Sequence, residues 1–80
     1  MIAVESTVQT LAQLQPGDHG VVEKIICNGP IQQRMLEMGL NPGVELEVIR
    51  KAPLGDPIEI YVRGFHLTLR RNEARCVILH

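Results

Sequence analysis

Apolar and polar residues alternate strictly in three stretches of the second half of the chain. The stretches cover residues 44–48, 58–63 and 65–70, and in each an apolar side chain takes every second position. A period of two is typical of strands with one buried and one exposed face. We therefore predict three antiparallel strands, with Phe65 on the buried face of the third and Gly64 allowing the reversal before it.

The first half of the chain shows one less regular apolar segment, over residues 19–27. Its imperfect alternation predicts a curved strand with a bulge near Glu23–Lys24. Thr10 and Gln13 fit the pattern of a capping box, which predicts a short helical turn before this strand. A helical turn over residues 72–75 and a last strand over residues 77–79 complete the expected elements.

A different period marks the segment between these strands. Ile31, Met35 and Met38 recur at intervals of four and three residues, which places them on one face of a short helix, where they are expected to fill the core. Gly39 is expected to end this helix in the left-handed conformation. Leu40 would then fold back on the last turn, as in a Schellman motif.

Five short strands and one inserted short helix indicate a mainly β (all-β) fold, a small closed or half-closed barrel. Closure removes the sheet edges that so small a protein would otherwise expose. The 80 residues are enough for one domain. We place that domain at residues 10–80 and predict a flexible N-terminal segment over residues 1–9.

Composition excludes several functions. Eight Lys and Arg against nine Asp and Glu give a net charge of −1, and one Tyr and one Phe are the only aromatic residues. Nucleic-acid binding needs a basic track and stacking platforms, so we expect none. The chain lacks the G-x-x-x-x-G-K-[ST] phosphate loop and any nucleophile with a recognisable base, so we expect it not to be an enzyme.

The sequence also indicates where the protein acts. It contains two cysteines, too few for the disulfide framework of a small secreted domain, and its start does not resemble a signal peptide. No apolar run approaches the roughly 20 residues that span a bilayer. We therefore expect a soluble protein of the cytoplasm.

Three further segments carry a resemblance to a known family. They are Arg34–Gly43, Ala52–Pro57 and Leu67–Ala74, with Leu14–Gly17 before them. At this spacing they resemble the FeoA family, small cytosolic proteins of bacterial ferrous iron uptake. The resemblance covers about residues 10–79. It implies an SH3-like barrel, which the five strands fit, and a role in supporting or regulating FeoB, the membrane ferrous iron transporter, from its cytoplasmic side. We expect a monomer or weak homo-oligomer.

Residues that folding does not explain are the candidates for binding this partner. We select Leu54 and Asp56 in the proline-rich loop, the outward Tyr61, Arg34 of the helix and Arg70. Two interpretations stay open for Leu54, which could anchor a partner or cover one end of the barrel. Arg34 is expected to be a solvated charge that pairs with Glu37.

Direct metal binding is the alternative function. The possible ligands are His19, Cys27, His66, Cys76 and His80, and pairing of the first and last strands would bring Cys27 and Cys76 together. Two thiolates favour zinc over ferrous iron, but the spacing matches no known ligand motif. We therefore expect both cysteines to be small, free apolar side chains, no required cofactor, and at most weak binding of Fe²⁺ or Zn²⁺.

Overall fold

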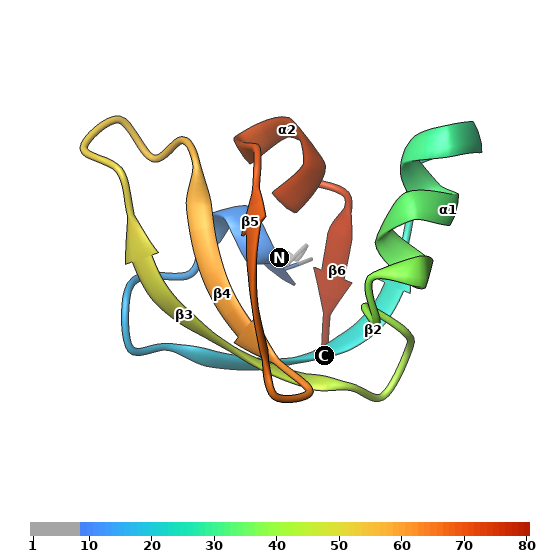
Figure 1. The fold of residues 1–80 in the computed structure, drawn as a ribbon, viewed down its shortest axis with the longest axis horizontal. Coiled ribbons are helices and arrows are strands. Elements are labelled where there is room, and N and C mark those ends of the chain that lie inside the picture. Colours follow the sequence, from blue (N-terminus) through green and yellow to red (C-terminus); the bar gives the residue numbers. More distant parts are fainter. Residues whose placement is uncertain (1–8) are drawn as a thin grey trace, which may run out of the picture.

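The computed structural model describes residues 9–80, which form a strongly curved antiparallel sheet with helices beside its open side (Figure 1). Along the sheet the strands follow the order β1-β6-β2-β3-β4-β5. Their bounds are β1 Gln9–Thr10, β2 His19–Ile25, β3 Glu45–Lys51, β4 Ile58–Val62, β5 Phe65–Leu69 and β6 Val77–Leu79. The helices are a 3-10 turn at Leu11–Gln13, α1 at Gly29–Glu37 and α2 at Arg71–Ala74.

The mainly β fold with one inserted helix is confirmed. All five expected strands are present, and the short β1 is a sixth, because Gln9 and Thr10 pair with Leu79 and Ile78. Two residues are too short a stretch to show alternation in the sequence. The predicted N-terminal segment lies outside the described residues, except for Gln9. No helix within residues 9–80 is long and apolar enough to cross a membrane.

Strand β2 pairs with a different neighbouring strand at each of its two ends. Its first residues, from His19 to Val21, pair with β3, and its later residues, from Val22 to Ile25, pair with β6. The register shifts between Val22 and Lys24, where the sequence predicts a bulge. A bulge bends its strand and increases the local twist, so β2 turns from one half of the sheet to the other.

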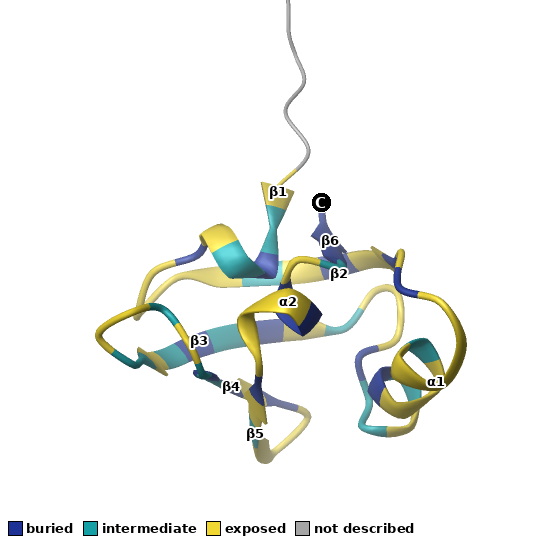
Figure 2. Cartoon of the chain, turned by 90° about the horizontal axis from the view of Figure 1, so that it is seen from above, coloured by how far each residue is buried: buried dark blue, intermediate teal, exposed yellow. Residues whose placement is uncertain are grey.

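The core lies inside the curved sheet, where the inward faces of the strands meet (Figure 2). The alternation predicts most of it correctly. Phe65 is the exception, since its side chain is 65% exposed. It follows directly on the turn that ends β4, and β5 pairs with β4 alone. The largest fully buried side chains are those of Leu11, Val22, Met35, Leu40, Leu46, Val48, Ile58, Ile60, Val62, Leu69 and Val77.

Helix α1 buries less than its pattern predicts. Met35 is fully buried, Met38 is half-buried, and Ile31 is 42% exposed. The expected Schellman motif is confirmed at its end. The N–H of Gly39 donates to the carbonyl of Leu36, and the N–H of Leu40 donates to the carbonyl of Met35, both at 3.1 Å. The buried Leu40 therefore fastens the end of α1 to the core.

The left-handed backbone at Gly39 makes the first prediction. Gly39 has φ +103°, and a Cβ there would lie 3.2 Å from Cδ of Arg63. Gly39→Ala should lower the free energy of unfolding by about 1–2 kcal/mol, measured by urea denaturation. Gly39→Asn is the control, because Asn tolerates this conformation better than Ala and should cost less. Equal losses in the two variants would show that the conformation is not what requires glycine.

Candidate partner-binding site

The loop between β3 and β4 carries the most exposed large apolar side chain of the described residues. Leu54 is 84% exposed, so the interpretation that it covers one end of the barrel is wrong. The loop is nevertheless ordered by its own backbone. The N–H of Gly55 donates to the carbonyl of Ala52 at 2.7 Å, and the N–H of Ala52 donates to the carbonyl of Pro57 at 3.1 Å. Leu54 therefore lies in a turn that two backbone hydrogen bonds close.

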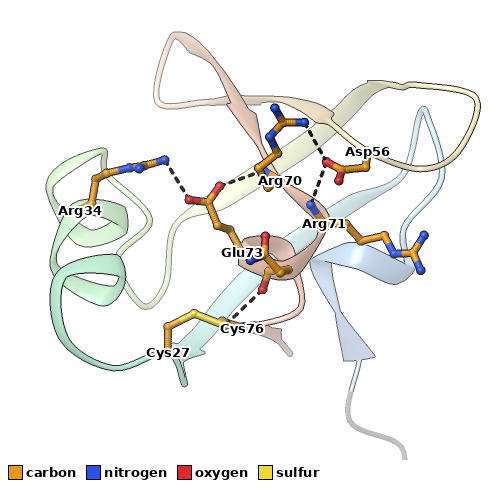
Figure 3. A network of polar contacts seen from close by, with 8 residues as sticks. Cys27, Arg34, Asp56, Arg70, Arg71, Glu73 and Cys76 are labelled. Carbon is orange, nitrogen blue, oxygen red and sulfur yellow. Dashed lines mark hydrogen bonds and ion pairs between the residues drawn. A yellow bond between two sulfur atoms is a disulfide. The ribbon is translucent and has the colours of Figure 1, made fainter.

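Two arginines beside α2 hold this loop from the other side (Figure 3). The carboxylate of Asp56 accepts the backbone N–H of Arg71 at 3.2 Å and lies 3.6 Å from Nη1 of Arg70. The guanidinium of Arg71 donates to the carbonyl oxygen of Leu54 at 3.2 Å. Exposed pairs of this kind contribute at most about 1 kcal/mol each. Their main effect is to fix the position of the loop.

A nearly buried carboxylate continues the same network. Glu73 is 8% exposed, and its Oε1 accepts the backbone N–H of Arg70 at 2.8 Å. Its Oε2 accepts Nη2 of Arg34 at 2.9 Å. The expected pair between Arg34 and Glu37 is therefore wrong, because the curved sheet brings α2 within reach of α1. Glu73 links α1, α2 and, through Arg70, the loop.

The structure brings four of the five selected residues into one network. Leu54, Asp56 and Arg70 lie at the loop, and Arg34 joins them through Glu73. Tyr61 lies apart on the outer face of β4, 42% exposed, as its outward orientation predicts. Its ring meets that of His66 edge-on, with ring centroids 5.1 Å apart.

Sequence reasoning missed two members of the network, Glu73 and Arg71. The signal for Glu73 is its place three residues after Arg70, the spacing of a capping box. The cap position of such a box is usually Ser or Thr, and Arg70 conceals the pattern. Arg71 carries no local signal, because its contact with Leu54 joins residues 17 positions apart.

The two cysteines lie together, as expected from pairing of the first and last long strands. They form a disulfide, with Cα atoms 5.2 Å apart, so the expectation of free side chains is wrong. In this state neither Cys27 nor Cys76 provides the thiolate that a zinc site would use. Residues 9–80 contain no group of three or more His, Cys, Asp or Glu side chains placed to hold a metal ion.

Comparison with known proteins places the chain in a family. A family model for the FeoA domain matches residues 9–80. The chain belongs to the FeoA family. It is 34% identical, over 64 residues, to a protein of Porphyromonas gingivalis described as an Fe(2+) transport protein A/Fe(2+) transporter FeoB fusion protein. That match covers 80% of this chain and 8% of the fusion protein, so the chain spans a small part of this relative.

Solved FeoA structures share the fold of this FeoA-family chain. The solution structure of FeoA from Chlorobium tepidum is 40% identical, with a TM-score of 0.84, over 90% of this chain and 69% of that one. A crystal structure of Stenotrophomonas maltophilia FeoA in complex with zinc, described as an SH3 domain protein, is 30% identical. Its TM-score is 0.81, over 90% of this chain and 89% of that one. The SH3-like fold and the link to ferrous iron transport agree with the sequence-based expectations.

The network around Glu73 makes the second prediction. Glu73→Ala should lower the free energy of unfolding by about 1–3 kcal/mol, because it leaves the backbone N–H of Arg70 and the side chain of Arg34 without their acceptor. Glu73→Gln keeps an acceptor for Arg70 and should cost less. Urea denaturation of Arg34→Met, Glu73→Gln and the double variant measures the coupling, expected to be about 1 kcal/mol.

Glu37 offers a matched control on α1. Its carboxylate is exposed and accepts the side-chain amide of Gln33 at 3.3 Å. Glu37→Gln should therefore change stability by less than about 0.5 kcal/mol. Independent, additive effects of Arg34→Met and Glu73→Gln would contradict a structural link between α1 and α2.

Proposed function

We propose that this protein is a non-enzymatic accessory of ferrous iron uptake that binds the cytoplasmic side of a FeoB-like membrane transporter. The observation that carries the proposal is the fusion protein of P. gingivalis, which joins a segment similar to this chain to a FeoB transporter. Fusion keeps two modules at a high effective concentration, which favours modules that act on each other. A separate chain must achieve the same association by affinity, and it therefore needs a binding surface.

The loop around Leu54 is the surface best suited to that task. Apolar residues that anchor an interface gain most when they enter a pocket on the partner and leave water. Leu54 is available for this, because its side chain is 84% exposed. Its backbone is already held by Arg71, so little conformational entropy remains to be lost on binding.

The charges around Leu54 indicate the kind of partner surface. The side chain of Arg70 is 68% exposed, and Arg71 is also exposed. Asp56 is in contact with both, so the loop presents an apolar tip beside a region of net positive charge. The complementary surface is an apolar pocket with carboxylates at its rim. Tyr61, on the outer face of the sheet, would belong to a separate and weaker contact.

Calorimetry with the purified cytoplasmic domain of the cognate transporter tests the proposal. We expect saturable binding, and titrations with and without guanine nucleotide and ferrous iron would show which state of the transporter the protein recognises. An unrelated GTP-binding domain is the control and should not bind. Equal binding to both domains, or no binding to the cognate domain in any state, would contradict the proposed function.

Leu54→Ala tests the surface. We expect it to weaken binding to the transporter domain about tenfold or more, since it removes the apolar anchor, and to leave the thermal unfolding temperature nearly unchanged. Phe65→Ala is the matched control. Phe65 is also exposed, at 65%, but lies at the other end of β4 from the loop. A large loss of stability in Leu54→Ala, or equal losses of binding in both variants, would place the contact elsewhere.

Metal binding is the second candidate function, because the similar FeoA of S. maltophilia was crystallised with zinc. In the oxidised form described here Cys27 and Cys76 are joined to each other, so thiolate ligation at this pair requires their reduction. Imidazole and carboxylate groups remain available at exposed pairs such as His66 and Glu59, 2.9 Å apart. Each such pair offers too few ligands for tight binding, so we propose no resident metal and at most weak binding of Fe²⁺ or Zn²⁺.

A further inference from the structure

The disulfide joins the two ends of the segment that carries α1 and α2. Cys27 lies between the end of β2 and α1, and Cys76 lies between α2 and the start of β6 (Figure 3). The two positions are 49 residues apart in the sequence. The backbone supports the same junction, because the N–H of Ile26 donates to the carbonyl of Cys76 at 2.8 Å. The disulfide and this hydrogen bond together fix the point at which the chain leaves the sheet and continues into α1.

Helix α1 depends on this junction more than a core helix would. Met35 is its one buried residue. Leu36 is half-buried against the core, and the polar contacts of α1 are partly exposed: the ion pair from Arg34 to Glu73, at 2.9 Å, and a hydrogen bond from the amide of Gln32 to the carbonyl of Ile25, at 3.4 Å. Elements with few buried apolar contacts open at lower free energy than the core. Removal of the disulfide should therefore loosen α1 before the sheet.

The two cysteine residues differ in their exposure to solvent. Cys27 is 9% exposed, whereas Cys76 is half-buried and more open to solvent. Thiol–disulfide exchange needs access to the attacked sulfur, which favours attack at Cys76. Cys27 is then the leaving group. It lies two residues before the first residue of α1, a nine-residue helix with no acidic residue in its first turn, and the partial positive charge there favours a thiolate.

We propose that Cys27–Cys76 is a thiol–disulfide exchange site for small thiols such as glutathione, and that its reduction releases α1 while the sheet stays folded. A thiolate attacks Sγ of Cys76 and forms a mixed disulfide, the bond to Cys27 breaks, and Cys27 leaves as a thiolate. A second thiolate attacks the small molecule's sulfur in the mixed disulfide and frees Cys76. The protein disulfide gains two electrons, and two thiols are oxidised to one disulfide. This site is independent of the proposed contact with a transporter.

Native-state reduction tests the site. The oxidised protein is incubated without denaturant at a series of reduced-to-oxidised glutathione ratios, and free thiols are alkylated and counted by mass spectrometry. Hydrogen exchange is followed in parallel. We expect the disulfide to open as the ratio rises, with faster exchange in α1 and unchanged protection in β3 and β4. Reduction only after unfolding, or reduction that leaves the exchange of α1 unchanged, would overturn the proposal.

Trapped mixed disulfides distinguish the two sulfurs. Acid quenching during reduction of the oxidised protein by glutathione, followed by mass spectrometry, should find glutathione on Cys76 about tenfold more often than on Cys27. The variant with both Cys27→Ser and Cys76→Ser is the control. Hydrogen exchange in its α1 should be fast at every ratio of reduced to oxidised glutathione. Equal amounts of glutathione on the two cysteines would overturn the order of attack, and free thiols of the reduced protein that oxidised glutathione does not join again would overturn the site itself.

Discussion

The bend in strand β2 is the constraint on which the rest of the structure depends. One strand must pair with β3 through its first residues and with β6 through its last. A straight strand would keep all its residues in one flat ladder, whereas the bulge between Val22 and Lys24 turns the second half toward β6. The sheet can then curl around its apolar face. The same bend brings Cys27, just after β2, to Cys76, just before β6.

The curled sheet also explains why a carboxylate becomes the central group of the polar network. It places α2 between α1 and the loop that precedes β4, within reach of both. Burial of Glu73 would be costly if it were unpaired, and the structure offsets that cost with two donors, the backbone N–H of Arg70 and the guanidinium of Arg34. Its neighbours Arg70 and Arg71 are thereby held where they contact Asp56.

Different contacts hold the loop with Leu54 and helix α1. The loop with Leu54 is held directly by its own turn and by Arg70 and Arg71, and it is connected to α1 only indirectly, through Glu73 and Arg34. Helix α1 is held by the disulfide, by the ion pair, and by Met35, Leu36 and Leu40 against the core. A change in the redox state of the cysteines would therefore act first on α1, which lies next to the disulfide. Both parts belong to the FeoA domain, which the family model matches over residues 9–80.

The sequence by itself determined the elements of this fold and most of its core. Alternation in β3 and β4, the 3.6-residue period around Met35 and the glycine at position 39 are local patterns, and local geometry follows from them. Only the tertiary structure decided the exposure of Phe65 and Leu54 and the pairing of Arg34 with Glu73, because these depend on which distant segment covers or meets each side chain. The disulfide is likewise a feature that only the tertiary structure decided. Its two positions could be expected to approach each other, but their bonding required the bend of β2, which places residues 49 positions apart with Cα atoms 5.2 Å from each other.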